Sequence, residues 1–171
     1  MNDIKSFPAI FSKNARLLIL GSMPSSTSLL KQQYYGHPRN AFWPIMGALF
    51  GAYPQLSYLQ RTAILQQQRI AVWDVLKSCR REGSLDVKID KASIQINEIP
   101  ALFITCPELS QVFFNGTAAE KFYKRHILQS LPASFSYIHY QRLPSTSPAH
   151  ASMSLAQKID AWRALQLPRA R

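Results

Sequence analysis

The chain has 171 residues, and this length favours a single domain with its core over about residues 16–165. Its 20 Lys and Arg residues against 9 Asp and Glu residues give a formal charge of +11, which favours a polyanionic partner such as nucleic acid. No apolar run approaches the roughly 18 residues of a membrane span, and residues 1–15 lack the apolar centre of a signal peptide, so a membrane or secreted protein is not expected.

The two cysteines, Cys79 and Cys106, form no CxxC pair, and the four histidines include no pair four residues apart. This spacing disfavours a disulfide scaffold, an iron–sulfur cluster and a zinc site, because each needs closely spaced ligands or bonded cysteines. We therefore expect no bound metal. Two reduced thiols fit a cytoplasmic protein.

The first apolar run, residues 16–21, ends at a glycine and predicts a buried strand. A loop over residues 21–43 follows, rich in Ser, Gly, Pro, Tyr and Asn. Polar loops of this length are usually functional or disordered, and the aromatic residues here argue against disorder. Residues 41–50 then predict a helix with Pro44 in its first turn, and residues 55–68 predict a second helix.

The middle of the chain reads as strand, loop and helix. A second strand is predicted over residues 70–73, directly before Asp74. The polar residues 78–90 predict a long loop. A helix is expected over residues 98–105, with Asn97 as its N-cap.

The third strand is predicted over residues 112–114, from a short aromatic and β-branched run. Thr117 and Glu120 have the spacing of a capping box, so a helix is expected to begin at Ala118. A fourth strand is predicted over residues 137–143.

The last part of the chain begins with the turn-rich residues 144–150. Ser154 and Gln157 then have capping-box spacing, and they precede an apolar stripe at helical intervals. A final helix is therefore expected.

Strands that alternate with helices predict βα units and hence an α/β fold, a three-layer α/β/α domain around a mostly parallel sheet. Three polar loops leave carboxyl ends of the predicted strands, after Gly21, Val72 and Leu143. In such a sheet these ends share one edge, so the loops are expected to form one cleft.

Several common motifs are absent from the sequence. It contains no GxxxxGK[ST] phosphate loop and no GxGxxG fingerprint, which disfavours nucleotide hydrolysis and dinucleotide binding. It also lacks the GxSxG turn of serine hydrolases.

The predicted cleft contains three kinds of candidate residue. Tyr34 or Tyr35 could stack on a flat ring, although either could instead pack in the core. Asn40 could orient a water or bond a base edge, and it could also cap the helix that follows. Asp74 is a candidate catalytic carboxylate, with a structural aspartate as the alternative.

The third loop offers hydroxyl groups. Ser145, Thr146 and Ser147 could hydrogen-bond phosphates, or they could form an ordinary Ser-rich turn. Some arginines could clamp a nucleic-acid backbone, with solvated charge as the default role of each. These are Arg39, Arg80, Arg81 and Arg142.

Five segments occur in an order that resembles the uracil-DNA glycosylase superfamily: GSMPSSTSL, YYGHPRNAFW, AVWDVL, NGTAA and LPSTSPAH. The segment YGHPRNAFW is similar to that of the mismatch-specific uracil/thymine-DNA glycosylases. The fuller pattern, with GSMPS and LPSTSPAH, is most similar to the hypoxanthine-DNA glycosylases, often counted as the sixth family. The resemblance implies a four-stranded, mostly parallel sheet with helices on both faces.

The resemblance also implies a site. The first motif, which begins Gly21-Ser22-Met23, would lie beside a flipped base, Tyr35 would stack on that base, and Asn40 would be the catalytic amide. Residues 143–150 would enter the minor groove. The assignments made on this basis are Asn40 and Asp74 as catalytic, Gly21, Ser22, Met23, Tyr35, His37 and Phe42 as base-binding, and Ser25, Arg39, Ser145, Thr146, Ser147, Ala149 and His150 as DNA-binding.

The sequence departs from the superfamily pattern at three positions. Met23 stands where many members carry Asp or Asn to direct water, and Ser145 stands where strong uracil enzymes carry His. Ala149 replaces an intercalating Leu. A fast uracil enzyme is therefore not expected.

We expect a monomeric, cofactor-free repair glycosylase that acts on DNA and removes a deaminated base, hypoxanthine first and uracil second, by base flipping. Three alternatives stay open: an inactive nucleic-acid-binding domain of the same fold, a mismatch-specific uracil/thymine enzyme, and a hydrolase of free nucleosides or nucleotides.

Overall fold

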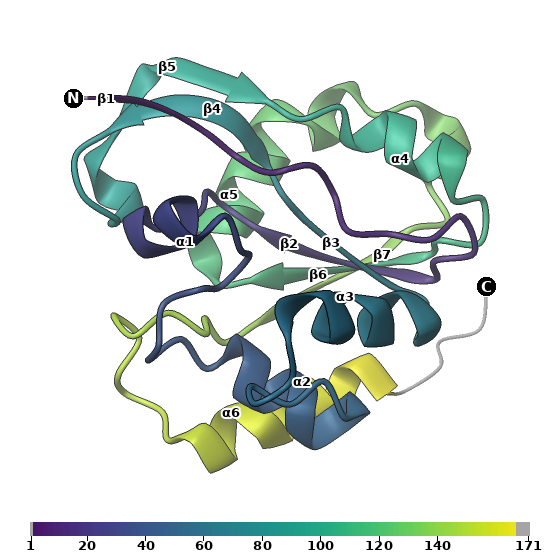
Figure 1. Cartoon of the computed structure of the whole chain (residues 1–171). Helices are drawn as coiled ribbons and strands as arrows, with labels where there is room; N and C mark the ends of the chain where they lie inside the picture. Colours follow the sequence, from purple (N-terminus) through teal and green to yellow (C-terminus); the bar gives the residue numbers. More distant parts are fainter. Residues whose placement is uncertain (1, 167–171) are drawn as a thin grey trace.

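The computed structural model describes residues 2–166, which fold around two β-sheets (Figure 1). The central sheet has the strand order β3-β2-β6-β7 and is parallel throughout. Its strands are β2 Leu17–Gly21, β3 Ile70–Asp74, β6 Gln111–Asn115 and β7 His139–Leu143. All four predicted strands and their parallel arrangement are confirmed, and the carboxyl ends of the strands lie at one edge.

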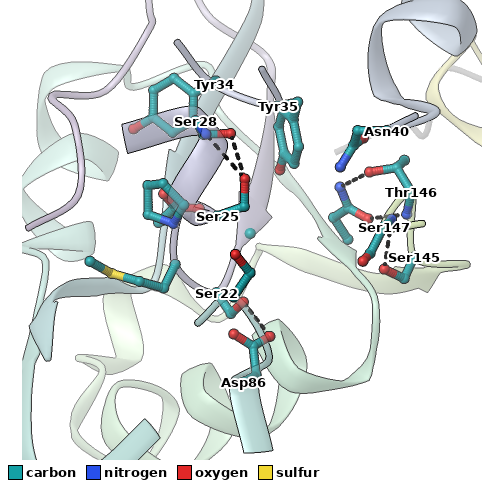
Figure 2. Close-up of a pocket in the computed structure, with 16 residues that line it drawn as sticks. Ser22, Ser25, Ser28, Tyr34, Tyr35, Asn40, Asp86, Ser145, Thr146 and Ser147 are labelled. Carbon is teal, nitrogen blue, oxygen red and sulfur yellow. Dashed lines mark hydrogen bonds between the residues drawn. The ribbon is translucent and has the colours of Figure 1, made fainter. Parts of the chain in front are cut away.

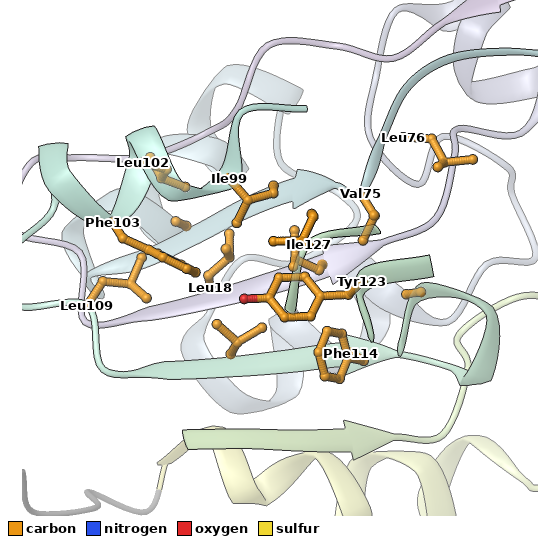
Figure 3. Packing of buried hydrophobic residues seen from close by; sticks show 14 of the residues in the cluster. Leu18, Val75, Leu76, Ile99, Leu102, Phe103, Leu109, Phe114, Tyr123 and Ile127 are labelled. Atoms are coloured by element: carbon orange, nitrogen blue, oxygen red, sulfur yellow. The ribbon is translucent and has the colours of Figure 1, made fainter. Parts of the chain in front are cut away.

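One face of the central sheet is covered by helices α4 (Ile99–Thr105) and α5 (Thr117–His126). Leu18 and Leu20 of β2 belong to the buried cluster on this face, which also contains Tyr123 of α5 (Figure 3). Side chains alternate along a strand, so the residues between them point to the other face.

Leu17 and Ile19 belong to a second buried cluster on that other face, together with Met46 and Trp162. The helices that cover it are α2 Phe42–Phe50, α3 Tyr58–Gln67 and α6 Leu155–Trp162. Helices on both faces of one sheet give the predicted three-layer α/β/α architecture. The 3₁₀ turns are η1 Asp86–Lys88, η2 Leu128–Ser130, η3 Ala133–Phe135 and η4 Arg163–Gln166.

A second, antiparallel sheet has the order β1-β4-β5 and was not predicted. Its strands are β1 Asn2–Lys5, β4 Leu76–Arg81 and β5 Ile89–Ile96. The expected loop over residues 78–90 is wrong at both ends, since residues 78–81 and 89–90 belong to β4 and β5, whereas residues 82–88 connect these strands into a β-hairpin. Strand β4 was not predicted because it contains several charged residues. Lys77 and Arg80 are exposed, whereas Cys79 and Arg81 are buried.

Helix α1, Ser26–Lys31, lies inside the expected loop over residues 21–43. Ser25 is its N-cap and accepts a hydrogen bond from the backbone N–H of Ser28 (3.2 Å). The helix is too short to show an apolar stripe, so the Ser-rich composition hid it.

Two predicted caps are wrong, and one is confirmed. The amide of Asn97 does not cap α4 but donates to the carbonyl oxygens of Asp74 (2.9 Å) and Leu76 (3.2 Å). Helix α5 begins at Thr117 itself, after Gly116, without a side-chain cap. The capping box that precedes α6 is present as predicted, and α3 has an unpredicted one formed by Ser57 and Gln60.

Candidate active site

A cavity of about 110 Å³ opens at the carboxyl edge of the central sheet (Figure 2). It brings together the three polar loops of the sequence prediction and adds the tip of the β4–β5 hairpin. Its lining residues are Gly21, Ser22, Met23, Pro24, Ser25, Ser28, Tyr34, Tyr35, Asn40, Asp74, Ser84, Asp86, Asn115, Ser145, Thr146 and Ser147.

The first wall is the loop that follows β2. The carbonyl oxygens of Gly21 and Ser22 accept hydrogen bonds from the N–H groups of Val75 (2.9 Å) and Leu76 (3.1 Å). These bonds fix the beginning of the loop to the chain that leaves β3. The side chain of Met23 packs into the core, while its backbone N–H has no acceptor among residues 2–166.

The second wall is aromatic, and it distinguishes the two neighbouring tyrosines. Tyr34 is buried, and its hydroxyl is near the carbonyl oxygens of Phe7 (3.0 Å) and Pro8 (3.1 Å), so it is mainly a core residue. Tyr35 stacks on Phe42, with ring centroids 4.0 Å apart and ring planes at 20°. Phe42 has no exposed surface, so it supports the Tyr35 ring from behind and does not line the cavity.

Tyr35 has an unusual backbone conformation, with φ of 56° in the left-handed region. Such conformations in non-glycine residues are uncommon and concentrate at functional sites. The Tyr35 hydroxyl is buried near the Asn115 and Asp74 side chains, yet no group among the described residues forms a hydrogen bond of normal geometry with it.

Asn40 lies where the loop over residues 21–43 meets α2. Its Oδ1 accepts a hydrogen bond from the backbone N–H of Phe42 (2.9 Å), which fixes the side chain at the mouth of the helix. No acceptor within residues 2–166 engages its Nδ2. The N-cap of α2 is Ala41, without a side-chain cap, so the predicted capping role of Asn40 is wrong, although its bond to the Phe42 N–H still fixes the amide. A fixed side chain and a group free to meet a ligand therefore occur in one residue.

Asp74 ends β3 beside Gly21 and is almost completely buried. A Cβ atom at Gly21 would collide with Asp74 Oδ1, so only glycine fits there. Asp74 Oδ2 has no hydrogen-bond partner among the described residues. Burial and then the charge of Asp86 raise the pKa of Asp74 to about 8, against the opposing effect of Arg81. Asp74 is therefore largely protonated at neutral pH.

The third wall is held by Asn115, a residue that the sequence prediction did not assign. Its Nδ2 donates to Thr146 Oγ1 and its Oδ1 accepts from the Thr146 N–H, both at 2.9 Å. The Thr146 carbonyl in turn accepts from the Ala41 N–H (2.9 Å). Thr146 is buried by these contacts, which leaves Ser145 and Ser147 as the more accessible hydroxyls. The position of Asn115 at a strand end was the signal that could have found it.

The fourth wall comes from the hairpin tip, through Ser84 and Asp86, which no sequence signal indicated. Ser22 Oγ donates to Asp86 Oδ2 at 2.6 Å (Figure 2). Burial raises the pKa of Asp86, while the Ser22 hydroxyl and Arg81 favour its ionised form. Arg81 has a fully buried side chain, so its default role as a solvated charge is wrong.

Five of the assigned residues lie outside the cavity wall: His37, Arg39, Phe42, Ala149 and His150. Two of them, Arg39 and His150, line a neighbouring hollow of about 260 Å³ together with Lys158 of α6. Lys158 Nζ donates to the His150 carbonyl (2.8 Å), and His150 Nε2 is buried without a partner among the described residues. The 39–40 turn and the 144–150 loop thus meet beside the cavity.

Two further observations apply to residues 2–166. No three His, Cys, Asp or Glu side chains gather in a group that could hold a metal ion. No helix in this part of the chain combines the length and the apolar character needed to cross a bilayer.

Comparisons with known proteins all match this chain to DNA glycosylases. The family model described as the uracil DNA glycosylase superfamily matches residues 8–166. A hypoxanthine DNA glycosylase of Methanosarcina acetivorans is 36% identical over 162 residues, which cover 94% of this chain and 96% of the relative. A hypoxanthine DNA glycosylase of Methanosarcina barkeri is 41% identical over 113 residues, which cover 66% of this chain and 70% of the relative. The solution NMR structure of a candidate uracil DNA glycosylase of M. acetivorans superposes with a TM-score of 0.76 at 34% identity, covering 97% of this chain and 100% of that one.

Proposed function

The chain belongs to the uracil DNA glycosylase superfamily, and we propose that it excises a deaminated base, hypoxanthine foremost, from DNA by hydrolysis of the N-glycosidic bond. Two relatives named hypoxanthine DNA glycosylase support this substrate class. The observation that carries the proposal is the cavity itself, where an aromatic face, a free amide, an unpaired backbone N–H and a neutral buried carboxyl converge.

The base would be held by stacking. A flipped nucleotide leaves the duplex and is received between aromatic or apolar side chains and hydrogen-bonding groups. The Tyr35 ring lines the cavity wall, and Phe42 packs against its other face and holds it in position. In this proposal Tyr35 is the base-contacting residue, and Phe42 acts through it.

The leaving base would be stabilised by two donors. When the bond from C1′ to the base nitrogen breaks, its electron pair goes to the base, and positive charge develops on the sugar. The free N–H of Met23 can donate to the developing base anion, as donors of an oxyanion hole do. Asp74, as a neutral acid, can donate its proton to the base in the same step.

Water would be placed by Asn40. An amide does not titrate, so it can orient the attacking water without acting as a base. Asn40 Oδ1 uses one lone pair to accept from the Phe42 N–H, so its second lone pair can accept from water, and Nδ2 is free to donate. Water adds to C1′ and releases one proton to solvent, while the base leaves with the proton donated by Asp74, which regains a proton from solvent. The chain's own groups suffice for this step.

The DNA backbone would lie across the mouth of the cavity. Ser25, Ser145 and Ser147 line it and can donate to phosphates, whereas Thr146 positions the loop. Arg39 and His150 line the adjacent hollow, where a flanking nucleotide would pass. Ala149 is exposed at the tip of the same loop and is too small to fill the gap left by a flipped base.

We further propose that the chain acts as a monomer, without metal, in the cytoplasm. The two buried free thiols, Cys79 and Cys106, are consistent with a reducing compartment. Sedimentation of the protein alone and with duplex DNA tests the stoichiometry, and a dimeric complex would contradict it.

A single-turnover excision panel tests the function. Hypoxanthine, uracil and xanthine are placed in single- and double-stranded DNA, and free deoxyinosine is included. Release of hypoxanthine from DNA, faster than release of uracil and without cleavage of the free nucleoside, is expected. Binding without release of any base would instead indicate an inactive DNA-binding domain.

A further inference from the structure

The tip of the β4–β5 hairpin contacts the first loop of the site although it belongs to the other sheet. Ser22 Oγ donates to Asp86 Oδ2 at 2.6 Å. The backbone N–H of Ser26 donates to Ser84 Oγ (2.9 Å), and Ser26 Oγ donates to the Gly83 carbonyl (3.2 Å). Three residues of the hairpin tip, Gly83, Ser84 and Asp86, therefore form hydrogen bonds with the loop and with the first residue of α1.

Arg81, the last residue of β4, contacts both the first loop of the site and the hairpin tip. Its side chain is fully buried, its Nη2 donates to the Pro24 carbonyl, and its Nε donates to the Gly83 carbonyl (2.9 Å). Its Nη1 lies 3.8 Å from Asp86 Oδ1. Because a planar guanidinium presents several donors in fixed directions, it can hold the loop and the hairpin tip in one geometry.

Among the described residues, no hydrogen bond from the central sheet reaches residues 23–26, although the side chain of Met23 packs into the core on that sheet. Hydrogen bonds from Val75 and Leu76 reach only the carbonyls of Gly21 and Ser22. Within residues 2–166, the hydrogen bonds to residues 23–26 from outside the loop and its own helix come from Arg81 and from the hairpin tip. These bonds, together with the packing of the Met23 side chain, set the direction of the Met23 N–H.

We propose that Arg81 and Asp86 are positioning residues that clamp residues 22–26 so that the Met23 N–H faces the leaving base. The proposal rests on the function proposed above. Met23 has no polar side chain, so the loop can assist the reaction only through its backbone, and a backbone donor is effective only when it is held in place. Neither positioning residue needs to touch the base.

Asp86 has a second effect, on charge. The groups that face Asp74 are Asp86 of η1, Arg81 of β4, Tyr34 and Tyr35 of the loop before α2, and Tyr58 of α3. The charge of Asp86 raises the pKa of Asp74, so its removal lowers that pKa. The alkaline limb of excision should then move to lower pH, which a purely structural role would not produce.

The test compares two carboxylates of the same hairpin. Asp86→Asn is expected to slow single-turnover hypoxanthine excision by about 10- to 100-fold, as a displaced catalytic donor would, while the Kd for DNA is unchanged. Asp90 pairs with Arg80 (2.8 Å) away from the cavity, so Asp90→Asn is the matched control and should leave the rate intact. Ser22→Ala, which removes the other partner of the 2.6 Å bond, should combine non-additively with Asp86→Asn.

Hydrogen exchange of the backbone amides provides a measurement that needs no substrate. The amides of residues 22, 23 and 25–27 should exchange faster in Asp86→Ala than in the unmutated chain, and not in Asp90→Asn. Unchanged exchange together with an unchanged excision rate would overturn the proposal. If the unmutated chain excises no base, the proposed function fails, while the exchange measurement still tests the clamp.

Discussion

Tyr35 lies flat against Phe42, with 4.0 Å between the ring centroids, and the Tyr35 ring of this pair forms the aromatic side of the cavity. Tyr35→Phe keeps the ring and should retain most single-turnover activity. Tyr35→Ala should lose roughly 1–3 kcal/mol of base binding, the usual worth of one stacked base. Equal and small effects of both changes would place Tyr35 outside the base site.

Asn40 combines a structural bond with a free donor, and two substitutions separate these roles. Asn40→Ala should lower single-turnover excision by about 10²–10³, or about 2.7–4 kcal/mol, as does the loss of one preorganised donor. Asn40→Asp keeps an acceptor for the Phe42 N–H, so its thermal stability should match that of the unmutated chain. Its excision should still fall, because a carboxylate repels the developing anion. Unmutated rates in both variants would leave Asn40 only its structural bond to the Phe42 N–H.

The pKa of Asp74 predicts a pH dependence of stability. The folded chain keeps this proton up to about pH 8, whereas the unfolded chain releases it near the ordinary pKa of 3.8 for an aspartate. Between these values the folded state binds more protons, so this group's contribution to stability falls as pH rises. Asp74→Asn removes that slope and should be more stable than the unmutated chain at pH 9. Denaturant midpoints at pH 5 and pH 9 measure the difference.

Excision should follow the same ionisation. If neutral Asp74 donates to the leaving base, the rate falls as pH rises through about 8. Asp74→Asn keeps a neutral donor, so it should retain part of the rate and lose the alkaline limb near pH 8. A limb that persists unchanged in Asp74→Asn would assign it to another group.

His150 follows the exposed Ala149 at the tip of the last loop and lines the hollow beside the cavity. If it fills the gap left by the flipped base, His150→Ala should weaken excision from duplex DNA more than from single strands, where no such gap exists. An equal loss on both substrates would contradict the wedge role.

Binding should depend steeply on salt, as the net charge of +11 indicates. If about five phosphates are neutralised, log K should fall against log[salt] with a slope of roughly −4 to −5 on duplex DNA. Fluorescence titrations over a range of salt concentrations measure this slope, and a value near zero would remove the electrostatic argument for a DNA partner.

The central sheet could be predicted because its signals are local. Each of its strands is a short apolar run, and the polar residue that follows it lies at the same edge as the others by the geometry of a parallel sheet. This predicts that Gly21, Asp74 and the loop over residues 144–150 share one cleft, and the cavity contains Gly21, Asp74 and residues 145–147 of that loop.

The remaining parts of the site depend on contacts between distant residues. The bond between Ser22 and Asp86 spans 64 positions, and that between Asn115 and Thr146 spans 31. No periodicity or capping pattern reports such pairs. Arg81 adds a further difficulty, because a charged residue next to exposed Arg80 gave no sign that it is buried.

The division of the cavity walls between two sheets has a consequence for how such a site can diversify. Ser84 and Asp86 stand on a hairpin whose strands, within residues 2–166, pair only with β1 and with each other, so its tip can change in length or composition without altering the register of the central sheet. Exchange of residues 82–87 between members of the superfamily should therefore alter the excision rate, through the loop that these residues hold, while the scaffold keeps its fold. The second sheet would then act as an adjustable support for the first loop of the site, and the parallel sheet as its frame.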